Sequence, residues 1–125
     1  MMNTIESKIN IHSPEYLENK KAFETYLQLW RSRLDVVKNG GGEEAIQRHK
    51  SRGKLTARER VEALLDADTA FLEFSTFAAW DMYEGAAPAA GVITGIGVVS
   101  GQECIIVAND ATVKGGTYFP MTVKK

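Results

Sequence analysis

The run "GVITGIGVVSGQECIIVAND", residues 91–110, constrains the fold more than any other part of the chain. Two stretches rich in β-branched residues meet at Ser100-Gly101, a pair that suits the two-residue turn of a β-hairpin. On the first stretch the even-numbered residues form one face, while the other face carries three glycines, Gly91, Gly95 and Gly97. A face that is bare in this way lets another backbone or sheet come close. The run therefore predicts a tightly packed antiparallel hairpin.

A long amphipathic helix is predicted for Pro14–Lys38. Its apolar residues recur at three- and four-residue steps, as a helical stripe requires, at Phe23, Leu27, Trp30, Leu34 and Val37. Ser13-Pro14 suits the start of a helix, and three glycines at 40–42 suit its end. The stripe is long for a chain of 125 residues. We therefore expect it to pack on another subunit or on further parts of its own chain, with packing in the local core as the alternative.

Two short helices are expected between Glu43 and Asp66, separated by "SRGK", residues 51–54. Thr56 and Glu59 have the spacing of a capping box, in which each side chain bonds the backbone N–H of the other. The alternating stretch "FLEF", residues 71–74, predicts a strand before the hairpin. Helices followed by hairpin strands indicate the α+β class.

Positive charge is concentrated in Arg48–Arg60, which holds six Lys or Arg and one Glu in a chain whose net charge is −1. Cations beside a helix N-terminus suit a phosphate, so Arg52 and Lys54 are candidate phosphate ligands. A solvated helical face is the alternative interpretation. A nucleic-acid-binding domain is a rival class, but no aromatic residues are interleaved with these cations as base stacking would require.

The sequence lacks the residue patterns of several other kinds of site and segment. The single cysteine, Cys104, excludes a disulfide framework, and we expect a buried, inert thiol. We find no catalytic constellation and no metal-ligand spacing, and "GIGVVS" is not a dinucleotide fingerprint because no helix opens after it. "MMNTIESKIN" has neither the apolar core of a secretory signal nor an Arg-rich transit pattern, and no stretch resembles a membrane span. We therefore expect a protein of the cytosol.

Two blocks in order carry a family resemblance: "RHKSRGKLTARERVEALLD", and about twenty residues later "PAAGVITGIGVVSGQECIIVANDATVKGGTYFPMTVKK". From about Trp30 to Lys125 the chain resembles the carboxyltransferase β subunits of biotin-dependent acyl-CoA carboxylases. "NDATVKGGTYFP" looks most like the methylcrotonoyl-CoA branch, since the propionyl-CoA branch typically has Asp-Phe-Thr-Val and Gly-Gly-Ser there. Geranyl-CoA, propionyl-CoA and acetyl-CoA carboxylases remain alternatives.

The resemblance implies a crotonase-like domain that holds acyl-CoA. Full subunits of the family transfer CO2 from carboxybiotin to an acyl-CoA, here 3-methylcrotonoyl-CoA of leucine breakdown. Biotin is carried by a partner, the biotin carboxylase and biotin-carrier α subunit, and β subunits form a homo-oligomeric, hexameric core. Bacterial members are cytoplasmic, and eukaryotic members lie in the mitochondrial matrix. No nucleic acid or membrane partner is implied.

The same resemblance predicts the organisation of the chain and its site. Residues 1–42 would be a helical extension and residues 43–125 the first, incomplete part of the acyl-CoA domain, an N-terminal fragment inactive alone. The residues expected to line the acyl-CoA cleft are Asn109, Asp110, Ala111, Thr112, Lys114, Gly115 and Gly116. Arg52, Lys54 and Arg58 would bind CoA phosphates. Lys114 would pair with a phosphate or face solvent, and a non-catalytic module binding acyl-CoA or a nucleotide is the other rival class.

Overall fold

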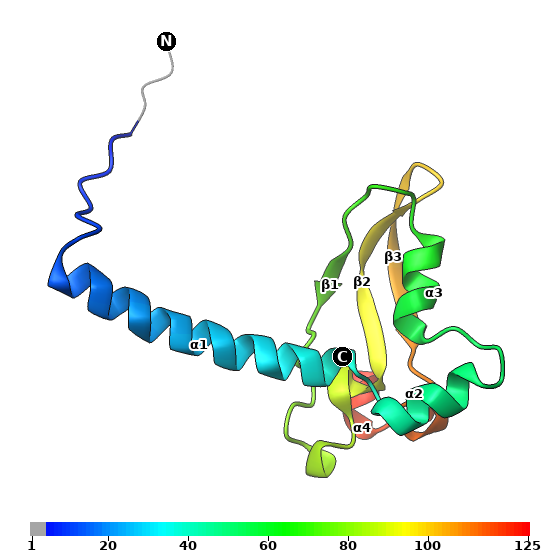
Figure 1. Cartoon of the computed structure of the whole chain (residues 1–125). Helices are drawn as coiled ribbons and strands as arrows, with labels where there is room; N and C mark the ends of the chain where they lie inside the picture. The colour runs from blue at the N-terminus through cyan, green and yellow to red at the C-terminus, as the bar shows by residue number, and fades with distance from the viewer. Residues whose placement is uncertain (1–4) are drawn as a thin grey trace. The chain divides into compact units, whose positions relative to one another are not determined.

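The computed structural model describes residues 5–125 of the chain. Residues 1–33 and 34–125 form two compact units, and the boundary between them falls inside the first helix. Four α-helices and three strands, joined by short 3₁₀ turns, are labelled in Figure 1. The predicted order of helices followed by hairpin strands is confirmed, and the described residues are α+β.

Helix α1 spans Pro14–Lys38, as predicted. Ser13 caps it, because its Oγ accepts a hydrogen bond from the Tyr16 amide at 3.2 Å, and proline at the first helical position has no N–H left unsatisfied. Trp30 is 49% exposed to solvent, whereas Val37 is only 2% exposed. The predicted apolar stripe is therefore real, but among the described residues only its C-terminal end is buried.

The sheet has three antiparallel strands in the order β1-β2-β3, with β1 at Leu72–Phe74, β2 at Val92–Val99 and β3 at Gln102–Asn109. The hairpin turn lies at Ser100 and Gly101, whose φ angles are 52° and 78°. Positive φ at both turn residues matches the right-handed twist of the paired strands. The predicted hairpin and its turn are confirmed.

Helices α2, Glu43–Lys50, and α3, Ala57–Leu64, also form as predicted, and α3 packs on β2 and β3 (Figure 1). The bare face of β2 makes this possible. A Cβ on Gly95 would lie 2.5 Å from the Leu72 carbonyl oxygen, and one on Gly97 would collide with the Leu65 side chain. The predicted close approach is thus made partly by the backbone of β1 and partly by side chains. Cys104 on β3 is half-buried rather than buried.

A short helix, α4 at Pro120–Lys124, closes a turn of unusual geometry before β2. Ala89 and Ala90 are buried with φ angles of 51° and 55°, a left-handed conformation that is costly for alanine. The Thr122 hydroxyl donates to the Ala90 carbonyl at 2.6 Å, and the Lys125 ammonium donates to the Ala89 carbonyl at 3.1 Å. The turn's carbonyl groups are therefore satisfied by the end of the chain. Burial lowers the pKa of Lys125.

Asp66, just after α3, holds the hairpin turn from outside the sheet. Its carboxylate accepts hydrogen bonds from the amides of Ser100 and Gly101, both at 2.7 Å, and its own amide donates to Val98 at 2.9 Å. A carboxylate that takes two backbone N–H groups fixes the turn and joins α3 to the tip of the hairpin.

No helix in the described part of the chain is both long enough and apolar enough to cross a lipid bilayer.

We expect Asp66→Ala to lower the free energy of unfolding by about 1–3 kcal/mol, because two turn amides lose a charged acceptor. Asp66→Asn should cost less, since one acceptor oxygen remains. Denaturant unfolding followed by circular dichroism measures both. Glu103→Ala, which removes an exposed carboxylate from the same hairpin, is the matched control, and an Asp66→Ala loss no larger than the control's would contradict the prediction.

Candidate functional site

The loop after β3 is fastened to the turn that precedes α2. The Asp110 Oδ1 atom accepts from the Thr112 amide at 2.9 Å and from its hydroxyl at 2.6 Å, and that hydroxyl accepts from the Gly41 amide at 3.0 Å. The glycines are required here, because a Cβ on Gly40 would lie 2.5 Å from Asp110 Oδ2. Two of the predicted cleft residues, Asp110 and Thr112, therefore position the α1–α2 turn.

The next three residues, Lys114–Gly116, all have positive φ, at 47°, 66° and 83°. Gly115 has open space where a Cβ would stand, so its backbone is accessible from outside. The Lys114 ammonium lies 4.4 Å from the centroid of the Phe119 ring, and that ring stacks on Tyr83 with centroids 4.7 Å apart. Lys114 is exposed and its cation also lies on an aromatic face, so both alternatives predicted for it, a phosphate contact or a solvent-facing side chain, stay open.

The remaining cleft candidates flank this turn. The Asn109 amide donates to the Tyr118 hydroxyl at 3.2 Å, and its side chain is exposed. Ala111 is exposed, and its Cα lies 3.5 Å from where a Cβ on Gly116 would stand. Within residues 109–116 the exposed positions are Asn109, Ala111, Lys114 and Gly115, whereas Val113 between them is buried at 1% exposure.

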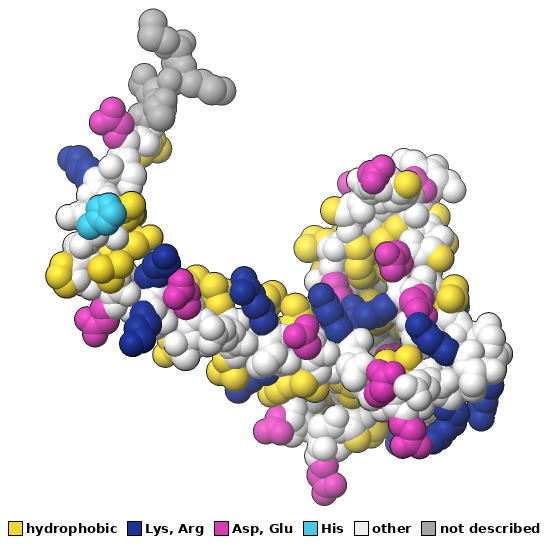
Figure 2. All heavy atoms as spheres, in the orientation of Figure 1, with side chains coloured by type: hydrophobic (Ala, Val, Ile, Leu, Met, Phe, Trp, Pro, Cys, Tyr) yellow, Lys and Arg dark blue, Asp and Glu magenta, His cyan; other side chains and the backbone are white. Residues whose placement is uncertain are grey.

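The second group of candidates lies on the loop between α2 and α3. Arg52 and Lys54 are both exposed and are separated by Gly53, whose φ is 71°. Figure 2 shows Lys and Arg side chains at the edge of the molecule formed by α2 and this loop. The loop is closed at its base, because the His49 Nε2 atom is 3.0 Å from the Leu55 carbonyl oxygen.

The N-terminus of α3 is capped by a carboxylate of the chain itself, that of Glu59. Thr56 Oγ accepts from the Glu59 amide at 3.3 Å, and the Glu59 carboxylate accepts from the Thr56 amide at 2.8 Å, which confirms the predicted capping box. Lys50 Nζ lies 2.5 Å from the same carboxylate. The hydrogen bond from Lys50, followed by that from the Thr56 amide, lowers the pKa of Glu59 from 4.5 to about 2.

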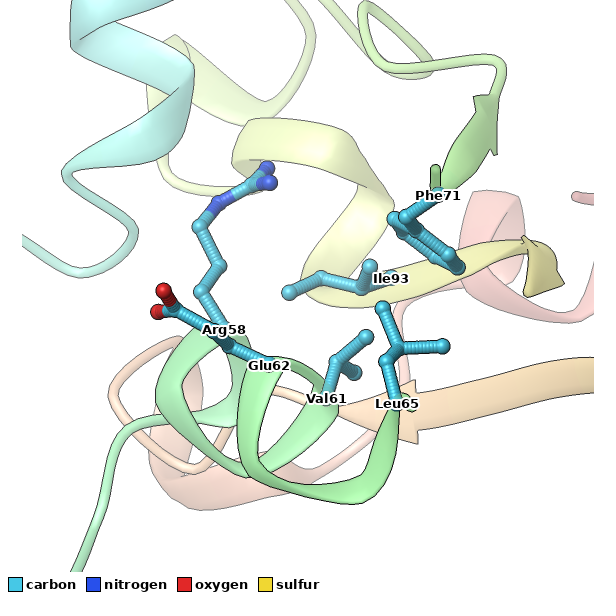
Figure 3. A pocket seen from close by; sticks show the side chains of 6 residues that line it. All are labelled: Arg58, Val61, Glu62, Leu65, Phe71 and Ile93. Atoms are coloured by element: carbon cyan, nitrogen blue, oxygen red, sulfur yellow. The ribbon is translucent and has the colours of Figure 1, made fainter. Parts of the chain in front are cut away.

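Arg58 points toward the sheet. Its two terminal nitrogens donate to the Glu73 carboxylate on β1 at 2.8 and 3.0 Å, in a half-buried, two-pronged ion pair. Figure 3 shows Arg58 and Glu62 beside a small pocket of about 170 Å³, whose apolar walls are Val61, Leu65, Phe71 and Ile93. Of the three predicted phosphate ligands, Arg52 and Lys54 thus share one loop, whereas Arg58 is engaged with Glu73.

Helix α2 separates the two groups of candidates. Its first residue follows the turn held by Thr112, and the Arg52–Lys54 loop begins just after its last residue. Eight helical residues span about 12 Å, so the loop of Arg52 and Lys54 begins about one α2 length from the turn that Thr112 holds. Cations on one segment and an accessible glycine backbone on another would suit an extended, anionic ligand that reaches both.

The low pKa of Glu59 predicts a pH dependence of folding. Because the folded value lies below the ordinary one, the stability it contributes is present above pH 4.5 and is lost as the pH falls toward about 2. We expect the wild-type chain to lose more thermal stability across this window than Glu59→Gln does, in melts recorded by circular dichroism. Glu62→Gln, on the same helix, should follow the wild type; parallel curves for Glu59→Gln and wild type would refute the prediction.

Known proteins resemble this chain over nearly its whole length. Residues 48–125 match the model of the family described as "Carboxyl transferase domain". The methylcrotonoyl-CoA carboxylase beta chain of Dictyostelium discoideum is 50% identical over 124 residues, 98% of this chain and 21% of that protein. A biotin-dependent 3-methylcrotonyl-coenzyme A carboxylase beta1 subunit of Mycobacterium tuberculosis is 61% identical over 94 residues, 75% of this chain and 18% of that protein.

A solved structure agrees with the sequence comparisons. The beta subunit of geranyl-CoA carboxylase from P. aeruginosa superposes with a TM-score of 0.83 at 30% identity, over 98% of this chain and 23% of that one. The expected crotonase-like carboxyltransferase fold is therefore confirmed. The chain spans about a fifth of the length of the curated relatives it matches. The family model matches more than half of the chain, so the chain belongs to the carboxyl transferase domain family.

Proposed function

We propose that residues 43–125 form part of an acyl-CoA-binding surface, with the CoA phosphates at Arg52 and Lys54. The observation that carries this proposal is the pair of exposed cations on a loop whose base is closed by His49 and Leu55. Exposed cations on a closed loop can meet phosphate oxygens without first breaking an internal ion pair. Arg58, which already binds Glu73, then serves to hold α3 in place beneath that loop.

The segment Asn109–Gly116 would contact the remainder of the CoA molecule through its backbone. Gly115 leaves open space beside a left-handed turn, so a ligand can approach the main chain there. In this proposal Asp110 and Thr112 act indirectly, because their side chains hold the α1–α2 turn. Asn109, Ala111, Lys114 and Gly116 complete the proposed contact surface.

For a full-length subunit we propose the carboxyltransferase step of an acyl-CoA carboxylase, in which CO2 moves from carboxybiotin to the acyl-CoA. Relatives named for 3-methylcrotonyl-CoA support that acyl group, and one is named as biotin-dependent. Biotin would be carried by a separate α subunit, and the residues assigned here would contact CoA alone. We propose further that β subunits form a hexameric core, in the bacterial cytoplasm or the mitochondrial matrix, and that the 125-residue chain is inactive alone.

Isothermal titration of the 125-residue chain with CoA, at low and at moderate salt, tests the binding proposal. We expect salt-sensitive binding that Arg52→Ala/Lys54→Ala weakens about tenfold or more, because two charge-assisted phosphate contacts are lost. Lys21→Ala/Arg31→Ala removes the same charge from exposed positions of α1 and is the matched control. Equal weakening by the two double variants, or no binding by a chain shown to be folded, would overturn the proposal.

A further inference from the structure

The loop that carries Arg52 and Lys54 has a second closure besides His49. Lys50, the last residue of α2, pairs with Glu59 in the first turn of α3 at 2.5 Å. Backbone hydrogen bonds of the loop lie at its start, where the Ser51, Arg52 and Gly53 amides donate to the carbonyls of Gln47, His49 and Lys50. The ion pair therefore links α2 and α3, the two helices on either side of the loop. It flanks the segment that contains Arg52 and Lys54.

The negative charge of Glu59 shows why its pairing with Lys50 needs an explanation. Glu59 follows Lys54 by five residues, and by charge alone its carboxylate weakens the attraction of an anion to this loop. A capping role alone does not require Lys50, because the bond between Glu59 and the Thr56 amide completes the capping box by itself. The additional pairing with Lys50 therefore calls for a role of its own, and the geometry offers one.

We propose that Lys50 and Glu59 are positioning residues that hold the Arg52–Lys54 loop in its binding conformation. This inference rests on the proposed CoA-binding function. Fixing the ends of a short loop reduces the number of conformations that it loses when a ligand binds. The entropic gain from a fixed loop then exceeds the cost of one screened negative charge at an exposed site.

Glu59 can act through its charge or by positioning the loop, and the two roles predict opposite changes in the CoA affinity of Glu59→Gln. This difference is the basis of the test. If Glu59 acts only through its charge, the variant binds CoA more tightly than the wild type. If it positions the loop, the variant binds about threefold to tenfold more weakly in isothermal titration, even though it is more positive. Glu62→Gln removes an exposed carboxylate from the same helix and should bind as tightly as the wild type or more tightly.

Variants at the other end of the pair separate positioning from direct contact. Lys50→Ala should weaken CoA binding to a similar extent, and Lys50→Arg should restore it. The double variant Lys50→Ala/Glu59→Gln should be no weaker than either single variant, because all three lack the same ion pair. Additive losses would mean that Lys50 binds phosphate itself and would overturn the inference, as would binding by Glu59→Gln that equals or exceeds the wild type.

A measurement without ligand separates this inference from the function on which it rests. Amide hydrogen exchange at residues 51–55 should be faster in Glu59→Gln than in the wild type and unchanged in Glu62→Gln. Unchanged exchange in Glu59→Gln overturns the positioning role whatever the chain binds. Faster exchange in a chain that does not bind CoA would support the loop closure and overturn the proposed ligand.

Discussion

The arrangement of the 34–125 unit depends on the missing side chains of Gly95 and Gly97. Because β2 is bare at these positions, the Phe71 ring and the Leu65 side chain lie against its backbone, and α3 rests directly on the sheet. A methyl group at either position would push the helix or the preceding segment away. The place of α3 in turn determines where the Arg52–Lys54 loop emerges. A constraint at the centre of the sheet thus sets the position of the exposed loop that carries Arg52 and Lys54.

Sequence patterns predicted those parts of the fold that local rules govern. The bounds of α1, the turn at Ser100-Gly101 and the capping box of α3 depend on residues a few positions apart, and all three are confirmed. The bond between Gly41 and Thr112 joins residues 71 positions apart, and Asp66 reaches a turn 34 positions away. No periodicity or spacing encodes such contacts. The three glycines at 40–42 were interpreted as a helix end, and the structure shows that Gly40 and Gly41 also leave room for Asp110 and Thr112.

The same limit applies to the candidate site. Arg48–Arg60 was interpreted as a cluster of positive charge, but three of its six cations are paired within the chain: Arg48 with Glu44, Lys50 with Glu59, and Arg58 with Glu73. The pairing of Arg58 depends on the antiparallel register of β1, which brings Glu73 beneath α3. The sequence gives the number of charged residues, but the fold determines which of them remain available to a ligand.

The three contacts on α3 have complementary roles. Glycines set its distance from the sheet, the Arg58–Glu73 pair connects it to β1, and the Lys50–Glu59 pair connects it to α2. All three contacts are made within the chain itself. In the proposed binding mode they hold the loop of Arg52 and Lys54 in place, so a phosphate that binds there would order little of the chain. In this proposal the Lys50–Glu59 pair matters for binding apart from what it adds to stability, because it restricts the loop rather than strengthening the core.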